Sequence, residues 1–272
     1  MNNFVKRSLT AVVFVALLLG CTFWNQLSFT LLFFTITTVG IWEFYSLAEK
    51  GNNHPQKITG TFAAVIMYTS TAVVSMDIMD ARFLLINIAV VFLIFIIELF
   101  STAEHPFANI AFTLLGLIYV ALPFSLLNFI TSYNGAYNYQ ILFGLFFILW
   151  SNDTGAYLVG SVIGKHKLFP RVSPGKTWEG SVGGAVMSYI VAYVISEWYT
   201  VINPFDWMII ATILIVIGSL GDLVESLFKR SIGVKDSGNI LPGHGGILDR
   251  FDSLILATPF VFVYLYLFSF IG

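Results

Sequence analysis

Asp206-Trp-Met-Ile-Ile-Ala-Thr-Ile-Leu-Ile-Val-Ile-Gly-Ser-Leu-Gly-Asp-Leu-Val-Glu-Ser-Leu-Phe228 is the stretch that decides the fold of this chain. A helix needs about 20 predominantly apolar residues to cross the hydrocarbon core of a bilayer, and this stretch supplies them. The whole sequence shares its character, because 57% of the residues are hydrophobic and only 10% are charged. A soluble domain carries about 25% charged residues. We therefore predict an all-α, polytopic integral membrane protein without a separate soluble domain.

The apolar runs predict about nine membrane-spanning helices. They lie near residues 8–24, 27–46, 58–76, 82–100, 108–131, 139–161, 179–199, 206–228 and 251–271. Lysine and arginine favour the cytoplasmic side of a membrane. With nine spans and a cytoplasmic N-terminus, every lysine and arginine except Arg82 falls on that side. The C-terminus is then outside, and the polar loops 162–178 and 229–250 face the cytoplasm.

The two parts of the chain differ in their polar content. Residues 1–105 contain few unusual polar groups, and we interpret them as a scaffold that could also carry the contacts of a homodimer. Glu43 and Glu98 lie near span ends and are interpreted as interfacial carboxylates that reach water. Residues 106–272 contain the recurring polar groups and are predicted to be the catalytic region.

The inner end of the eighth span carries a polar stripe. Asp222, Glu225, Ser226 and Lys229 are spaced so that they share one helical face. A simple pairing of Glu225 with Lys229 would also explain the stripe. Asp153 lies in another apolar run, where a carboxylate is costly. It either lines the same cavity or makes a structural hydrogen bond between helices.

The start of the ninth span repeats this pattern with Asp249 and Asp252. Two helices joined by one loop would thus bring carboxylates to the same depth. Carboxylates repel one another unless cations intervene, and hard oxygen ligands of this kind suit Mg²⁺ together with substrate phosphates. We predict Asp222, Asp249 and Asp252 as metal ligands.

The loop between these helices has the composition of a phosphate-binding surface. It contains Gly245 and Gly246, and its cations are Lys229, Arg230, Lys235 and Arg250. Glycine lets backbone amides approach a ligand, and amides together with cations bind phosphate. A basic loop touching anionic lipid would look similar, but His244 and the flanking acids speak against a purely electrostatic patch.

The other polar loop ends in Ser173-Pro-Gly-Lys-Thr-Trp-Glu-Gly180. Ser173 and Pro174 suit an N-cap and a first helical position, which predicts a span beginning near Lys176. An anion at that helix end would gain from the amides, the helix dipole and the lysine. Ser173 and Lys176 are therefore candidate substrate-binding residues.

The stretch from Ser226 to Asp252 resembles the signature of the phosphatidate cytidylyltransferases, also called CDP-diacylglycerol synthases, of the bacterial type. The likeness rests on Ser226, Lys229-Arg230, Lys235-Asp236, Pro242, His244-Gly245-Gly246, Asp249-Arg250 and Asp252. Ser173–Gly180 and Asn152–Tyr157 also resemble family features. The resemblance is strongest over residues 140–272.

The resemblance implies that CTP and phosphatidate react to CDP-diacylglycerol and pyrophosphate at the cytoplasmic face of a bacterial inner membrane. It implies a two-cation centre at the aspartates, with Mg²⁺ as one ion and K⁺ as a candidate for the second. Lys229, Arg230, Lys235, Arg250 and Lys176 would bind phosphates, and His244 would contact the triphosphate. Ser226, Gly245, Gly246 and Asp153 would line the substrate site. Nucleic acid is not an expected partner.

Two other functions are compatible with parts of this pattern. A related CTP-dependent lipid kinase, of the polyprenol or dolichol type, would use similar groups but transfer the γ-phosphoryl group. A transporter would use Asp153 and Asp222 as ion-pathway residues. The charge-dense loop 229–250 argues against simple permeation, which does not need it.

Overall fold

The computed structural model describes residues 3–238 and 245–269, with side chains from Ser8 onward. The chain divides into two compact units. The first comprises residues 1–137 and 231–251, and the second comprises residues 138–230 and 252–272. The bounds of these units do not coincide with the predicted functional boundary between residues 105 and 106. Compactness does not test a division by function, so that boundary stays a prediction.

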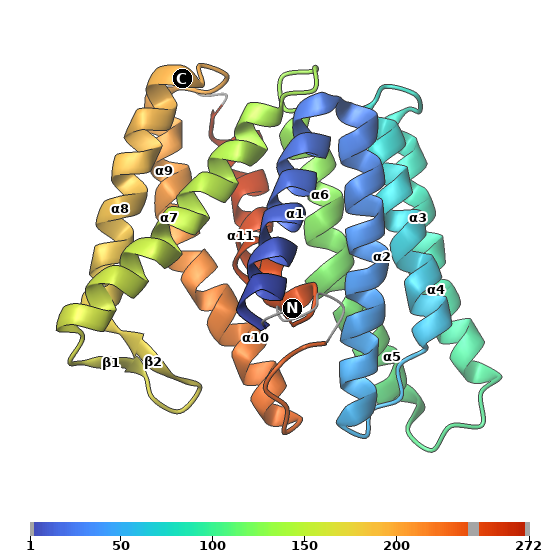
Figure 1. Ribbon diagram of the computed structural model, residues 1–272. Coiled ribbons are helices and arrows are strands. Elements are labelled where there is room, and N and C mark those ends of the chain that lie inside the picture. The colour runs from blue at the N-terminus through green and yellow to red at the C-terminus, as the bar shows by residue number, and fades with distance from the viewer. Residues whose placement is uncertain (1–2, 239–244, 270–272) are drawn as a thin grey trace. The chain divides into compact units, whose positions relative to one another are not determined.

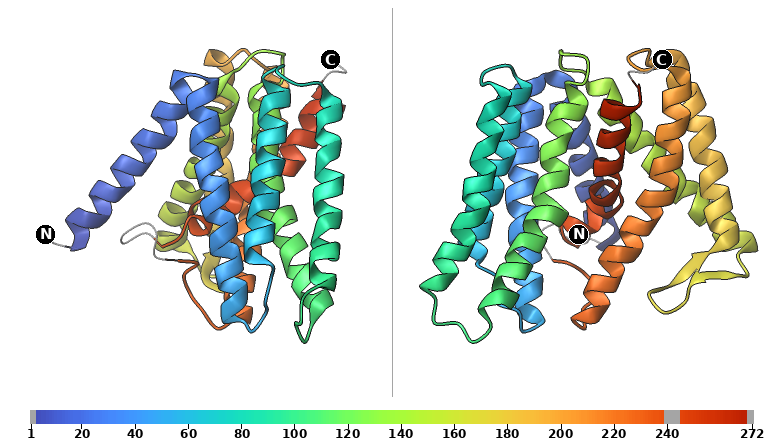
Figure 2. Two further views of the ribbon diagram at one scale, coloured as in Figure 1. Left: turned by 90° about the vertical axis from the view of Figure 1, so that its right-hand side faces the viewer. Right: turned by 180° about the vertical axis from the view of Figure 1, so that it is seen from behind.

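The first unit contains six α-helices and two short helical segments. They are α1 (Asn3–Trp24), α2 (Gln26–Lys50), α3 (Lys57–Ser75), η1 (Ala81–Leu85), α4 (Ile86–Leu99), α5 (Pro106–Gly116), η2 (Leu117–Ala121) and α6 (Leu122–Thr131). Helices α2, α3 and α4 run side by side (Figure 2). Tyr45 of α2 is fully buried against Gly60 and Gly116, and its hydroxyl donates to the carbonyl of Thr113 at 2.8 Å. Small residues thus let these helices approach closely.

The second unit contains the remaining helices and a small hairpin. They are α7 (Tyr139–Ile163), β1 (Lys167–Phe169), β2 (Ser173–Thr177), α8 (Trp178–Trp198), α9 (Pro204–Ile213), η3 (Leu214–Gly218), α10 (Ser219–Ser231) and α11 (Leu248–Leu267), whose first turn belongs to the first unit. Helices α7 and α8 pack together and β1 and β2 connect them (Figure 1). A Cβ atom on Gly155 of α7 would lie 2.8 Å from the carbonyl oxygen of Gly183, so glycine permits this close crossing.

The prediction of an all-α polytopic membrane protein is confirmed. Within the described residues, eight helical segments are long and apolar enough to cross a membrane, and Ser8–Trp24 is a shorter apolar helix. These nine segments follow the predicted runs closely, while the number that cross the membrane stays a prediction. Exposed apolar side chains cover their outer faces. Helix α4, for example, buries only Ile94 and Glu98, which leaves most of its other side chains for lipid.

Two of the long segments contain a π-helical turn. Leu117–Ala121 precedes Pro123, which has no backbone N–H to donate. Leu214–Gly218 lies directly before Ser219 and Asp222. A Cβ atom on Gly221 would lie 2.6 Å from the carbonyl oxygen of Asp252, so α10 and α11 approach closely just beyond this turn. Such π turns often occur beside functional residues.

The prediction that Ser173 caps a helix is wrong, although the predicted helix start near Lys176 lies close to the observed one. Ser173–Thr177 instead forms strand β2, which pairs antiparallel with β1. Helix α8 begins at Trp178, and the Thr177 hydroxyl accepts from the Gly180 amide at 3.2 Å as its N-cap. The carboxylate of Glu179, in the first helical turn, accepts from the amides of Lys165 and His166. The chain that enters the hairpin is thereby fastened to the start of α8, which favours a hairpin over an earlier helix.

Candidate active site

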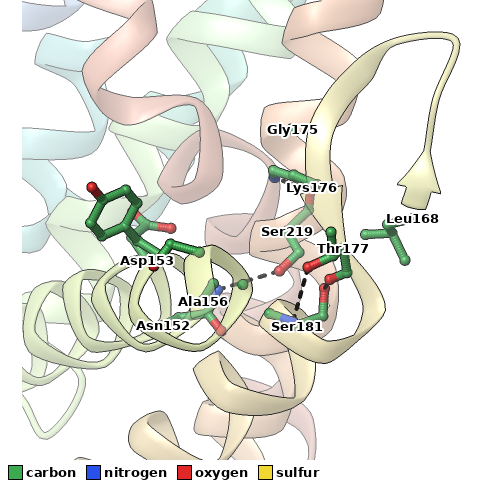
Figure 3. A pocket seen from close by; sticks show the side chains of 13 residues that line it. Asn152, Asp153, Ala156, Leu168, Gly175, Lys176, Thr177, Ser181 and Ser219 are labelled. Carbon is green, nitrogen blue, oxygen red and sulfur yellow. Dashed lines mark hydrogen bonds between the residues drawn. The ribbon is translucent and has the colours of Figure 1, made fainter. Parts of the chain in front are cut away.

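A pocket of about 440 Å³ lies in the second unit, between α7, the hairpin, α8 and the start of α10 (Figure 3). Its lining residues are Asn152, Asp153, Ala156, Tyr157, Gly160, Ser161, Leu168, Gly175, Lys176, Thr177, Gly180, Ser181 and Ser219. The residues come from segments that are far apart in sequence.

Lys176 and Asp222 form an ion pair at this pocket. The Lys176 Nζ lies 2.6 Å from the Asp222 Oδ2, and both side chains are about one-third exposed. Lys176 also donates to the carbonyl of Ser219 at 3.4 Å, and Asp222 accepts from the Ser226 hydroxyl at 3.2 Å. The strand thus delivers a cation to the first turn of α10.

Two further aspartates carry charge into the same region. Asp153 is exposed towards the pocket from α7, beside Asn152, whose amide donates to the Ser219 hydroxyl at 3.4 Å. Asp252 of α11 interacts electrostatically with Asp222, Asp153 and Lys176. Three carboxyl groups therefore lie within electrostatic range of one ammonium group, which makes the site attractive to a further cation.

The donor chemistry of this cluster fits Mg²⁺. The available ligands are carboxylate, amide and hydroxyl oxygens, which hard cations prefer. Among the residues that the structure describes, no group of three or more His, Cys, Asp or Glu side chains could hold a metal ion as it stands. This does not conflict with Mg²⁺, which proteins commonly bind through one or two carboxylates together with water and substrate phosphates.

The rest of the polar stripe on α10 forms a separate pair. Lys229 Nζ lies 3.1 Å from Glu225 Oε2, and the Glu225 side chain is buried. Asp222 and Ser226 form their own hydrogen bond one turn earlier. The stripe therefore consists of the Glu225–Lys229 pair and the Asp222–Ser226 pair, and only the second contacts Lys176. Arg230 is exposed at the end of the same helix.

The described signature residues between α10 and Phe251 belong to the first unit, whereas Asp252 belongs to the second. Asp249 Oδ2 accepts from the backbone amides of Ser237 at 3.0 Å and Gly246 at 2.9 Å. Asp222 and Asp249 lie in different units, so their predicted pairing around a metal stays a prediction. Gly245 has φ +84°, a conformation that L side chains rarely adopt.

The remaining predicted residues are distributed as follows. Lys235 and Arg250 are exposed. His244 lies outside the described residues. Ser173 is half-buried on β2, opposite Phe169, and does not line the pocket.

Glu43 and Glu98 are buried, so their interpretation as interfacial carboxylates is wrong. Each is only 4% exposed. Glu98 accepts from Gln56 Nε2 at 2.6 Å and Asn109 Nδ2 at 2.9 Å. Glu43 accepts from the amides of Ile247 and Leu248 and from the Ser237 hydroxyl. A carboxylate in an apolar run indicates a need for buried partners, but it does not identify them.

The fold and the pocket together define a class: a polytopic membrane protein with a carboxylate-rich, lysine-containing site among its helices. A family model described as "Cytidylyltransferase family" matches residues 5–268. The chain therefore belongs to the cytidylyltransferase family.

Relatives named phosphatidate cytidylyltransferase match either part of the chain or nearly all of it. The protein of Staphylococcus saprophyticus is 47% identical over 174 residues, which is 63% of this chain and 65% of the relative. That of Bacillus subtilis is 43% identical over 164 residues, which is 60% of this chain and 61% of the relative. These alignments span less than two thirds of either relative. That of Staphylococcus epidermidis is 36% identical over 255 residues, which is 93% of this chain and 95% of the relative.

Proposed function

We propose that the protein transfers the cytidylyl group of CTP to phosphatidate, giving CDP-diacylglycerol and pyrophosphate. The carrying observation is the pairing of Lys176 with Asp222 in a pocket that also receives Asp153. Family membership and the names of the relatives support the same substrates. A cation held among carboxylates suits a reaction between two polyanions, which must be brought together against their repulsion.

In the proposed reaction, a phosphate oxygen of phosphatidate attacks the α-phosphorus of CTP. A new oxygen–phosphorus bond forms, and the bond from the α-phosphorus to the oxygen leading to the β-phosphorus breaks. Pyrophosphate carries away the bonding electron pair. The protein itself contributes positioning and charge neutralisation, which dominate catalysis of phosphoryl transfer.

The residues of the pocket have distinct roles in this proposal. Lys176 contacts a phosphate of CTP, and Asp222 holds the Lys176 ammonium in place. Asn152 and Ser219 form a hydrogen-bonded polar wall beside them. Mg²⁺, held by one or two of the carboxylates of Asp153, Asp222 and Asp252, would neutralise triphosphate charge. K⁺ is the candidate for a second cation.

The proposed location is the inner membrane of a bacterium, with the pocket open to the cytoplasm. The hairpin beside the pocket carries Lys165, Lys167 and Arg171. Basic residues favour the cytoplasmic ends of spans. This orientation would give the pocket direct access to CTP, while phosphatidate would arrive from the surrounding lipid. A homodimer is compatible with the proposal but is not required by it.

Purified protein supplied with Mg²⁺, phosphatidate and CTP labelled at either the α- or the γ-phosphate would test this function. Label from the α-phosphate should enter the lipid, and mass spectrometry should detect CDP-diacylglycerol. Entry of γ-label instead would indicate a lipid kinase. Ion flux in liposomes without nucleotide, with no labelled lipid, would indicate a transporter.

A further inference from the structure

We infer that Glu43 of α2 is a positioning residue that holds the signature segments on both sides of residues 239–244. The inference rests on the proposed function for its catalytic meaning. Its structural basis lies entirely within the first unit, which contains α2 and residues 231–251. Glu43 is between 194 and 205 residues from its partners in these segments, outside the region where the family resemblance is strongest.

The Glu43 carboxylate is bound by three donors from two short segments. The amide of Ile247 donates to Oε2 at 2.9 Å, and the amide of Leu248 donates to Oε1 at 3.1 Å. The Ser237 hydroxyl donates to Oε1 as well. These residues and Glu43 are all buried. Charge-assisted hydrogen bonds of this kind are stronger than neutral ones, so one side chain ties both segments to α2.

The bond to Leu248 also places Glu43 at the first residue of α11. The first amides of a helix have no partner within the helix, and a negative charge near them is favourable. Asp249 completes the arrangement, because its Oδ2 accepts from the amides of Ser237 and Gly246. Glu43 and Asp249 therefore hold Ser237 and the segment 246–248 together in one hydrogen-bond network.

Gly246 shows that the segment is fitted closely around Glu43. A Cβ atom there would overlap both Glu43 Oε1 and Ser237 Oγ. A Cβ atom on Gly238 would lie 3.0 Å from Glu43 Oε2. The backbone at both glycines approaches the Glu43 carboxylate too closely to leave room for a side chain at Gly246. A loop that served only to carry charge would not need this close contact.

The position of Glu43 gives it influence over the reaction without contact with substrate. Arg250 follows Leu248 by two residues in α11, and Lys235 precedes Ser237 by two residues. Both cations are predicted to bind phosphates. Loss of the Glu43 carboxylate would leave buried amides without their acceptor and release both segments. We expect the placement of these cations to suffer more than the fold as a whole.

The test compares Glu43→Gln with Glu98→Gln in the full-length protein in detergent. Each change removes one carboxylate charge at equal burial in the same unit. Hydrogen exchange should quicken at least tenfold for the amides of residues 245–251 in Glu43→Gln and stay unchanged there in Glu98→Gln. The kcat for CDP-lipid formation should fall at least tenfold in Glu43→Gln, with a less than threefold change in the KM for phosphatidate.

Ser237→Ala keeps the inference testable if Glu43→Gln does not fold. It removes one donor to Glu43, and kcat should fall about threefold with faster exchange confined to the same segment. When both substitutions can be made, their effects should not add, because the two side chains form one network.

Unchanged exchange of residues 245–251 in both Glu43→Gln and Ser237→Ala would overturn the inference. An equal response of that segment to Glu98→Gln would also overturn it, because the effect would then be general destabilisation. Wild-type protein that makes no CDP-lipid would count against the proposed function alone, since the exchange measurement needs no turnover.

Discussion

The pocket cluster of the second unit and the Glu43 network of the first unit use carboxylates in opposite ways. Around Glu43 the donors are backbone amides and a buried hydroxyl, supplied by the protein itself. At the pocket, Asp222 is partly exposed and paired with a partly exposed lysine, while Asp153 faces the open space. The difference suggests a division of labour. Carboxylates enclosed by protein donors fix backbone, whereas carboxylates open to a pocket remain available to ligands.

The largest expected effect belongs to Asp222→Asn, which tests whether a carboxylate open to the pocket serves the reaction. The change keeps the shape of the side chain but removes the charge that holds Lys176 and attracts a cation. We expect kcat/KM for CTP to fall by about 10²–10³-fold, the range found when a positioned electrostatic group is removed. The midpoint of thermal unfolding should move little. A variant with near-normal turnover would remove Asp222 from the proposed machinery.

Lys176→Met should produce the next largest loss. Its ammonium is the cation that strand β2 brings to the carboxylates, and the methionine keeps most of the apolar stem. We expect about a 10²-fold loss in kcat/KM for CTP, because a phosphate would lose a charged partner. Lys165→Met is the matched control, since Lys165 is exposed on the same hairpin and its change should stay within about twofold. Equal losses in both variants would indicate only a general effect of positive charge.

Asp153→Asn separates the two interpretations of that residue. The structure places Asp153 on the pocket wall, within electrostatic range of Lys176 and Asp222. If its charge helps to hold a cation, activity should fall about tenfold and the Mg²⁺ concentration for half-maximal activity should rise. Assays over a range of Mg²⁺ concentrations would measure both. Retention of most activity with an unchanged Mg²⁺ requirement would favour a structural role.

Gly246→Ala tests whether the close fit of the backbone around the enclosed Glu43 carboxylate matters for activity. The added methyl group would overlap Glu43 and Ser237, so the segment must move although no charge is lost. Overpacking of this kind typically costs about 1–3 kcal/mol, and we expect about a fivefold fall in kcat. Gly20→Ala is the control, because a Cβ atom there meets nothing within 4 Å. If activity assays show no difference between these variants, the close fit around Glu43 has no functional consequence.

The sequence allowed the fold class and the extent of the apolar helices to be predicted, because the bilayer imposes length and composition on each span. It also marked Asp153, Lys176, Asp222 and Asp252, which the second unit brings together. It did not predict the hairpin, since Ser173-Pro174 equally suits a helix start, and the bonds to Glu179 come from Lys165 and His166, just before the opposite strand.

The role of Glu43 could not be predicted for a related reason. A carboxylate near the end of an apolar run looks interfacial until its donors are known, and those donors lie at residues 237, 247 and 248. Local patterns carry information about partners within a few turns of helix. They carry little about a hydrogen bond that spans most of the chain, or about the bond between Gln56 and Glu98, which are 42 residues apart.

Asp206→Asn should have the smallest effect on activity, because this enclosed carboxylate lies outside both the pocket and the Glu43 network. Asp206 is another enclosed carboxylate, which accepts from the hydroxyls of Tyr264 at 2.6 Å and Ser269 at 2.8 Å. These bonds join α9 to the end of the chain and involve no pocket residue. We expect thermal unfolding to occur a few degrees lower, as about 1 kcal/mol would produce in a protein of this size, with kcat within about twofold of wild type. A large fall in kcat would mean that enclosure alone does not separate structural carboxylates from functional ones, because the enclosed Asp206 would then behave like the open Asp222.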